Sequence, residues 1–361
     1  MAVVQANVGL QLGAGGGHVA QILLDNDFDH NALRPFKEGN RNYISRNRGK
    51  NVDGKTWNME AVPIRNDATL RKDEWIQLDK TVLVAGRTRL RAFADLRSAS
   101  SYSIGDGMGT TVLQTQAMSD PGSAMISMDG LRQGEGDRPH FDLTNLPLPI
   151  IHSDWQFPAR EIWISRKEGR GLDYSMAEAA ARRVAEKVEE LTVGVAATYS
   201  FGGGTIYGYL TYPDRITKVI TSPEAGGWTP EDLLEEVMEM RAALVAKKKY
   251  GPYRIYVAPG WDAYLDTDYS AAKGDLTVRD RLLKVSGITS ISTLDTLTGY
   301  RMVMVQMDSA TARAVVGMEL TTVQWETHGG MQFNFKTMCI LIPQMRKDYD
   351  SNTGIVDANI A

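Results

Sequence analysis

Three aspartates near the N-terminus alternate in the way that the first ligands of a calcium-binding loop do: Asp25, Asp27 and Asp29. Such a loop needs glycine at its sixth position, where the chain turns sharply, and a bidentate glutamate at its twelfth. This sequence has His30 and Phe36 at those positions. We therefore interpret the segment as a polar turn and predict no metal there.

The glycine-rich run at residues 105–109 resembles a loop that cradles a phosphate group. A phosphate-binding loop follows a strand and opens a helix, whose positive end faces the anion. We expect neither element around this run, so we interpret it as the flexible base of a hairpin. The sequence also has no nucleophile elbow and no Walker A loop.

The remaining groups that could perform catalysis are isolated in the sequence. The five histidines lack the spacing of metal ligands. Four carboxylates could pair as acid and base (Asp142, Asp154, Glu161 and Asp173), but nothing in their spacing singles them out. Cys339 lies in an apolar run, where a buried and inert thiol is expected. We predict that the protein is not an enzyme and has no catalytic, cofactor-binding or metal-binding residue.

The composition is typical of a folded protein without disulfide bonds. The chain has 361 residues, with 40 Lys and Arg, 44 Asp and Glu, and one cysteine. This length allows two domains, and the formal charge of −4 argues against a generally basic nucleic-acid coat. The single cysteine fits a reducing compartment. We see no signal peptide and no membrane span, so we expect synthesis in the cytoplasm and no membrane partner.

The first 60 residues have the composition of an arm rather than of a domain. Residues 34–55 carry seven basic residues against Glu38 and Asp53, a local net charge of +5. Asn and Gly are frequent there, which favours loop over helix. Such a basic arm is either a solvated loop or a partner for nucleic-acid phosphates. Its basic residues are Arg34, Lys37, Arg41, Arg46, Arg48, Lys50 and Lys55.

A helix is predicted within residues 68–96, and a long hairpin follows it. Residues 103–146 contain seven glycines and no lysine. Two β-like runs, at residues 110–118 and 123–128, flank a turn signal at residues 119–122. Two strands alone are marginally stable in water, so this hairpin needs a surface on its own body or on a neighbouring chain. The apolar residues that we expect to make an inter-subunit contact are Val112, Leu113, Met118, Met125, Ile126 and Met128.

The clearest predicted helix begins with a capping box formed by Ser175 and Glu178. Its apolar stripe predicts a spine that runs to about Tyr199 and ends at the glycines of residues 202–204. The stripe consists of Met176, Ala180, Val184, Val188, Leu191 and Val195.

A compact α/β-type domain is predicted after the spine. A second helix begins at Thr229 and Pro230, and strands near residues 253–258, 288–294 and 301–307 alternate with short helices. The final stretch, residues 321–343, reads as two strands joined across a pair of glycines.

The order of these elements resembles a known family of shell proteins. Residues 146–195 resemble the segment of encapsulins and tailed-phage major capsid proteins that enters the peripheral domain and forms its spine helix. Residues 229–265 resemble the axial-domain helix, turn and strand of the same family, and the resemblance covers about residues 140–345. It implies an α+β fold of the Hong Kong 97 type, with an N-terminal arm, an extended β-hairpin loop, a peripheral domain with a long spine helix, and an axial domain.

The resemblance to this family implies that the chain divides into six segments. The N-terminal arm is expected at residues 1–60 and the extended loop at 103–146. The other expected segments are a peripheral-domain helix region at 61–102, the peripheral domain with its spine helix at 147–215, the axial domain at 216–320, and the closing strands with the C-terminus at 321–361.

The resemblance implies many copies that form pentamers and hexamers and close into an icosahedral shell. The long basic arm and the long extended loop favour a phage coat that encloses double-stranded DNA, with non-specific DNA contacts. Scaffold, portal or decoration proteins are further possible partners, and the expected location is the virion capsid, assembled in the bacterial cytoplasm. The alternatives are an encapsulin-type nanocompartment shell and, less favoured, an enzyme with an α/β domain.

We also predict a shell without covalent cross-links. In some members of the family, a lysine of the extended loop forms an isopeptide bond with an asparagine of a neighbour. Such chemistry needs a neutral amine, but residues 103–146 contain Arg132 and Arg138 and no lysine. A guanidinium stays protonated and cannot replace that amine.

Overall fold

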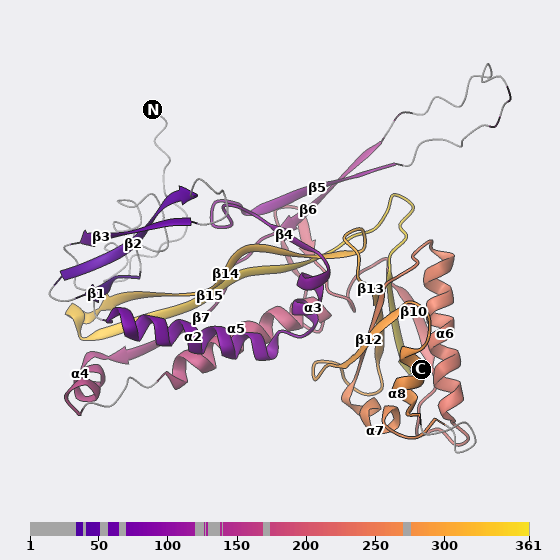
Figure 1. The fold of residues 1–361 in the computed structure, drawn as a ribbon. Helices are drawn as coiled ribbons and strands as arrows, with labels where there is room; N and C mark the ends of the chain where they lie inside the picture. Colours follow the sequence, from indigo (N-terminus) through magenta and orange to yellow (C-terminus); the bar gives the residue numbers. More distant parts are fainter. Residues whose placement is uncertain are drawn as a thin grey trace. The chain divides into compact units, whose positions relative to one another are not determined.

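The computed structural model describes residues 34–38, 41–50, 57–64, 70–119, 126, 128, 138, 140–168, 174–269 and 276–360. The chain divides into two compact units (Figure 1). The first draws on Met1–Arg89, Ile150–Ala185 and Glu319–Cys339. The second draws on Leu90–Pro149, Glu186–Met318 and Ile340–Ala361.

The basic arm forms strands, where the sequence favoured a loop. Strands β1 (Phe36–Glu38), β2 (Arg41–Lys50) and β3 (Trp57–Ile64) form an antiparallel sheet in that order. Ile44 is buried, and the ring of Phe36 stacks on its cross-strand partner, 5.9 Å between centroids. The loop prediction was wrong because these apolar cross-strand contacts outweigh the local preferences of Asn and Gly.

The helix predicted within residues 68–96 is two helices, α2 (Lys72–Arg89) and α3 (Ala92–Ala99). The predicted apolar positions of α2 are buried up to Val82, whereas Leu83 is exposed. At the break, residues 90–91, the carboxylate of Glu189 in α5 (Ser175–Val193) accepts hydrogen bonds from the first two amides of α3, so a residue outside both helices holds the start of α3. Periodicity alone could not reveal that contact.

The predicted spine is α5 (Ser175–Val193), which follows β7 (Ile151–Pro158) and α4 (Ala159–Glu168). Four of the six stripe residues are buried, while Met176 and Val195 are exposed. The helix ends earlier than predicted, because Gly194 has φ +89° and turns the chain out of the helix. Residues that were expected to extend it form β8 (Tyr199–Phe201) instead, which pairs with β9 (Gly204–Ile206).

The two predicted closing strands are present as β14 (Ala312–Thr327) and β15 (Gln332–Met345), with β14 starting earlier than expected. They form a four-stranded sheet in the order β4-β14-β15-β7, in which β4 spans Ser101–Ser103. On one face of this sheet, Trp155 stacks on Phe335 with 4.2 Å between ring centroids, and Phe157 packs edge-on to both. This aromatic cluster is the core of the first unit.

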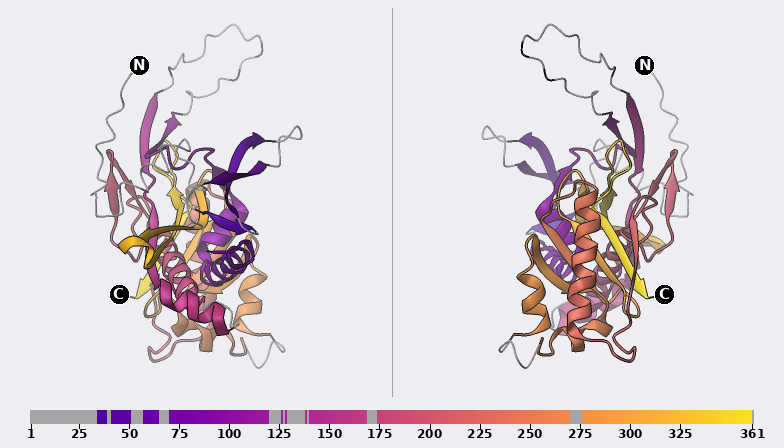
Figure 2. Two further views of the ribbon diagram at one scale, coloured as in Figure 1. Left: turned by 90° about the vertical axis from the view of Figure 1, so that its left-hand side faces the viewer. Right: turned by 90° about the vertical axis from the view of Figure 1, so that its right-hand side faces the viewer.

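The second unit contains a five-stranded sheet in the order β10-β16-β13-β11-β12. Helix α6 (Pro230–Ala246) runs along one face of it (Figure 2), and its buried residues Leu233 and Val237 share a core with the sheet. The helix begins where the sequence indicated, with Pro230 in its first turn, and Thr229 and Asp232 form a capping box there. The strands are β10 (Ile216–Ile220), β11 (Tyr253–Val257), β12 (Ile288–Thr293), β13 (Met302–Gln306) and β16 (Ile355–Ile360), and the short helices are α7 (Asp262–Leu265) and α8 (Val278–Leu283).

Strand β16 is an interior strand of this sheet, paired with β10 on one side and with β13 on the other. Its Asp357 is almost fully buried and accepts hydrogen bonds from two guanidinium groups, Arg215 at 3.1 Å and Arg301 at 2.7 Å. A buried carboxylate is tolerated when it is paired in this way. The sequence prediction grouped residues 321–361 together, and the domain boundaries stay a prediction.

Candidate assembly surface

The extended loop contains a two-stranded antiparallel ladder formed by β5 (Val112–Met118) and β6 (Phe141–Pro147) (Figure 1). The sequence predicted the right first strand but the wrong partner, because residues 123–128 were expected to pair with it. In the ladder Met118 lies opposite Phe141 instead. The turn signal at residues 119–122 favoured the nearby run at residues 123–128. The true partner strand, β6, begins more than twenty residues after the end of β5.

One face of this hairpin is apolar and open to solvent. The side chains of Met118, Phe141 and Leu143 are between 57% and 59% exposed. They share one face because residues alternate sides along a strand and directly opposed residues lie on the same side. We call these three residues the hairpin apolar face. Such a contiguous exposed apolar patch on a marginal two-stranded ladder is a candidate contact surface.

The root of the hairpin is held by close backbone contacts that only glycine permits. A Cβ atom on Gly107 would lie 2.2 Å from the carbonyl oxygen of Gly317, and one on Gly204 would lie 2.1 Å from that of Asn145. The side-chain amide of Asn145 also donates a 3.1 Å hydrogen bond to the backbone carbonyl of Gly202. These contacts fix the direction in which the hairpin leaves the second unit.

Helix α3, which leads through β4 into the hairpin root, is anchored by two carboxylates. Glu189 of α5 accepts hydrogen bonds from the amides of Ala92 at 2.6 Å and Phe93 at 3.2 Å. Asp95 of α3 forms an ion pair with Arg254 and accepts a 3.1 Å hydrogen bond from the hydroxyl of Tyr256. Burial raises the pKa of Glu189, although the amides of α3 oppose that rise.

A groove of about 860 Å³ lies beside the hairpin. Its walls come from both hairpin strands, from residues 203–205 and 212–214, and from residues 344–351. Lys347 and Asp214 form an ion pair within it at 3.0 Å, and Asp142, Asp348 and Arg346 also line the groove. Across the described residues, no group of three or more His, Cys, Asp or Glu side chains could hold a metal ion.

Of the six loop residues named from the sequence, the five that the structure describes fall into three groups. Val112 and Leu113 are half-buried at the root, while Met118 belongs to the hairpin apolar face. Ile126 and Met128 are fully exposed and outside any strand. Met125 lies outside the described residues. Sequence reasoning missed Phe141 and Leu143, although the alternation of these two residues with the polar Asp142 and Thr144 was the available signal.

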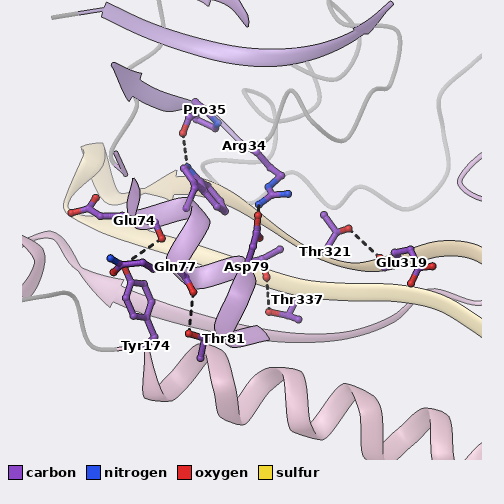
Figure 3. Close-up of polar contacts among 12 residues, drawn as sticks. Arg34, Pro35, Glu74, Gln77, Asp79, Thr81, Tyr174, Glu319, Thr321 and Thr337 are labelled. Carbon is purple, nitrogen blue, oxygen red and sulfur yellow. Dashed lines mark hydrogen bonds and ion pairs between the residues drawn. The ribbon is translucent and has the colours of Figure 1, made fainter. Parts of the chain in front are cut away.

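The basic residues of the arm differ in their contacts, and Arg34 is bound to helix α2. Arg34 donates to both carboxylate oxygens of Asp79 at 2.5 and 2.6 Å and lies 4.7 Å from the ring centroid of Trp75 (Figure 3). The indole of Trp75 donates a 2.9 Å hydrogen bond to the carbonyl of Pro35. Arg34 therefore secures the start of the arm to α2 and is not free to meet a phosphate.

The other basic positions are exposed or undescribed. The side chains of Lys37 and Arg41 are exposed. Those of Arg46, Arg48 and Lys50, and all of Lys55, lie outside the described part of the chain, so their predicted role stays a prediction.

Cys339 is buried, as the sequence indicated, with 1% of its surface exposed. A thiol in this position is closed to partners outside the chain while the protein is folded. Among the helices that the structure describes, none is long and apolar enough to cross a membrane.

Comparisons with known proteins place the fold. A family model described as a family of unknown function (DUF6260) matches residues 65–358. The type 1 encapsulin shell protein EncA of Myxococcus xanthus (strain DK1622) is 27% identical over 194 residues, which are 53% of this chain and 61% of that relative. The match thus spans less than two thirds of the relative's length.

Two solved structures share the arrangement of elements. A virus-like particle from Pyrococcus furiosus has a TM-score of 0.54 at 14% identity, covering 79% of this chain and 98% of that one. The capsid of Myoviridae phage XM1 has a TM-score of 0.55 at 11% identity, covering 69% of this chain and 85% of that one. The predicted α+β fold of the Hong Kong 97 type is confirmed.

Proposed function

The chain belongs to the DUF6260 family, and we propose that it is the structural major capsid protein of a bacteriophage. In this proposal many copies self-assemble into an icosahedral shell that encloses the double-stranded DNA genome, and non-covalent contacts hold the shell together. The protein acts as a subunit and not as an enzyme. The fold supports this proposal, because its solved neighbours include a phage capsid and a virus-like particle.

The hairpin is the observation that carries the proposal. It exposes Met118, Phe141 and Leu143 on a ladder of only two strands, and the described part of the chain leaves more than half of each of these side chains uncovered. Burying roughly 1,000 Å² of apolar surface per subunit would contribute a gross term near 25 kcal/mol at about 25 cal/mol per Å², from which association costs are subtracted. A neighbouring copy that covers the hairpin would supply such burial without any covalent bond.

The proposed partners follow from the shell. Pentamers and hexamers of the chain would form it, and the exposed arm residues Lys37 and Arg41 would contact packaged DNA in a sequence-blind, salt-dependent way. Scaffold, portal or decoration proteins would join in the bacterial cytoplasm, where the virion capsid is assembled.

Purifying the chain alone tests the proposal. We expect particles, tubes or capsomers under negative stain and elution far above 40 kDa from a sizing column. A chain that stays monomeric over a wide range of salt and protein concentration, with no particles under the microscope, would contradict the proposal.

A second candidate, an encapsulin-type nanocompartment shell, is favoured by the likeness to the encapsulin shell protein of Myxococcus xanthus. The content of particles purified from the native source separates the two. Double-stranded DNA inside supports the capsid, whereas an enclosed enzyme in particles without DNA supports the compartment.

A further inference from the structure

Two arginines lie near each other where β14 begins and β15 ends. The Nε atom of Arg313 donates a 2.6 Å hydrogen bond to the side-chain carbonyl of Gln344. Arg346 follows Gln344 by two residues, and its backbone amide donates a 2.7 Å hydrogen bond to the carbonyl of Thr311. Since residues two apart along an extended chain lie on the same side, Arg313, Gln344 and Arg346 share one face.

Neither guanidinium has a counter-charge among the residues that the structure describes. Their hydrogen bonds go to neutral oxygens, because Arg313 donates to Gln344 and the Nη1 atom of Arg346 donates to the carbonyl of Ser309 at 2.9 Å. Burial lowers the pKa of Arg313, and the positive charge of Arg346 lowers it further. Both side chains are half-buried, so water screens this repulsion only in part.

The position of Arg313 is held by its neighbours on two other strands. Its guanidinium carbon lies 4.3 Å from the ring centroid of Tyr102 on β4, the strand that pairs with this part of β14. Gln344 is held in turn, because its amide donates a 3.3 Å hydrogen bond to the hydroxyl of Thr115 on β5. The terminal nitrogens of Arg313 make no hydrogen bond within the described part of the chain. They are preorganised donors for an acceptor from outside.

The carboxylates of the nearby groove do not supply the missing negative charge. Arg346 lines this groove, so the site is accessible from it. Asp214 pairs with Lys347 at 3.0 Å, and Asp348 accepts two hydrogen bonds from Asn352. Asp142 also lines the groove, but it forms no ion pair with either arginine. Two positive charges thus share one face without a partner of opposite sign among the described residues.

We propose that Arg313 and Arg346 form a binding site for a phosphate group, either carried by nucleic acid or free in solution. A phosphate bound to both guanidiniums accepts charge-assisted hydrogen bonds from each and offsets their repulsion. Arginine suits this role, because its planar donors match the geometry of phosphate oxygens. The inference goes beyond the proposed function, since phosphate can bind to this site whether or not the chain forms a shell.

Titration of the full chain with inorganic phosphate tests the site. Chloride keeps the ionic strength constant, and calorimetry follows the binding. Arg346→Gln should weaken phosphate binding by about ten-fold or more, because the charge-assisted hydrogen bonds of one guanidinium are lost. The matched control, Arg183→Gln, removes an exposed charge from α5 and should bind phosphate like the wild type. If Arg346→Gln does not fold, Arg346→Lys takes its place: it keeps the charge, loses the planar donors and should also bind more weakly.

A short DNA duplex is the second probe and distinguishes the two sources of phosphate. If Arg346→Gln weakens the binding of the duplex as well as that of inorganic phosphate, the site accepts the phosphates of nucleic acid. If only the binding of inorganic phosphate is weakened, the site takes free phosphate.

A thermal measurement separates a binding site from a pair of arginines with a structural role alone. Phosphate should raise the melting temperature of the wild type by mass action and leave that of Arg346→Gln nearly unchanged. Equal binding of both probes by the wild type and Arg346→Gln would overturn the proposal. Acetate that displaces phosphate at equal concentration would also overturn it, because the site would then select a carboxylate, such as an acidic side chain of a second copy. Neither readout depends on particles, so its failure is distinct from failure of the proposed function.

Discussion

The carboxylate of Glu189 on the spine helix accepts a 2.6 Å hydrogen bond from the backbone amide of Ala92, the first residue of α3. The first amides of a helix have no partner within the helix, and a carboxylate there also meets the positive end of the helix dipole. Since α3 leads through β4 to the hairpin root, this bond connects the spine to the hairpin.

Removing this side chain should destabilise the second unit. Glu189→Ala leaves buried amides without acceptors, which costs about 1–3 kcal/mol in the free energy of unfolding. Glu189→Gln keeps one acceptor and should lose less. Denaturant unfolding of the unassembled subunit measures both. Equal losses for the two variants would mean that the contribution of Glu189 does not come from its hydrogen bonds.

The contact between Glu189 and the start of α3 also predicts that the stability of the fold depends on pH. Burial raises the pKa of Glu189, so the folded chain binds its proton more tightly than the unfolded chain, in which the pKa is about 4.3. The contribution of this group to stability is therefore full below about pH 4.3 and is lost as the pH rises through the raised pKa. Relative to Glu189→Gln, which cannot ionise, the wild type should lose stability over that range. A difference that stays constant from about pH 4 to pH 8 would contradict this.

Shortening the hairpin should abolish closed particles without unfolding the chain. Replacing residues 116–143 by Asn-Gly keeps the root pairs of Thr115 with Thr144 and Gln114 with Asn145 and closes them with a favoured two-residue turn. The expected product is a soluble subunit that elutes near its monomer mass. Normal shells from this variant would show that the hairpin is not an assembly element.

The glycine contact at the root can be tested with a neighbouring glycine as its control. Gly107→Ala would place a Cβ atom 2.2 Å from the carbonyl oxygen of Gly317, so the hairpin root must shift. Gly105→Ala meets nothing within 4 Å. We expect Gly107→Ala to lower particle yield strongly, and Gly105→Ala to assemble normally. Equal particle yields would mean that the direction of the hairpin is set elsewhere.

Two arginines of the basic arm should respond differently to removal. Arg34→Gln loses the ion pair with Asp79 and the contact with Trp75, and should lower stability by about 1 kcal/mol. Arg41→Gln removes an exposed charge, so it should leave stability unchanged and weaken DNA association at low salt. Thermal unfolding and a salt titration of DNA binding measure the two effects. A loss of DNA binding for Arg34→Gln alone would reverse this assignment.

Mature particles should dissociate fully on a denaturing gel. The loop at residues 103–146 has no lysine for an isopeptide bond, and Cys339 is buried. Boiling with and without reductant should give a single band near 40 kDa. High-mass bands that survive reductant would refute the absence of covalent links.

The sequence predicted the elements whose signals are local. Short-range patterns predicted the start of α6 at Thr229, the apolar stripe of α5 and the two strands that meet near Gly329. Each of these features depends on residues that are close together in the sequence. The sequence-based prediction failed where a contact with a residue far along the chain determines the local structure. The partner of β5 is fixed by a register that joins Met118 to Phe141, and the break between α2 and α3 is fixed by Glu189, about one hundred residues away.

The candidate site was accessible in part. Met118 was named because it lies in the predicted first strand of the hairpin. Phe141 and Leu143 were missed because residues 123–128 were predicted as the second strand instead of β6. The role of Arg34 could not be foreseen, since a basic side chain in an Asn- and Gly-rich stretch gives no hint of the aspartate that it meets on α2.

The interior position of β16 has a consequence for synthesis. Strand β10 and strand β13 both hydrogen-bond to β16, and Arg215 and Arg301 both depend on its Asp357 for a counter-charge. Because β16 is the last of these strands to leave the ribosome, the sheet stays open until translation has passed residue 360. A chain terminated early would expose an unpaired strand edge and two uncompensated guanidinium groups. Under the proposed function, we therefore expect subunits that lack β16 to stay out of the particle.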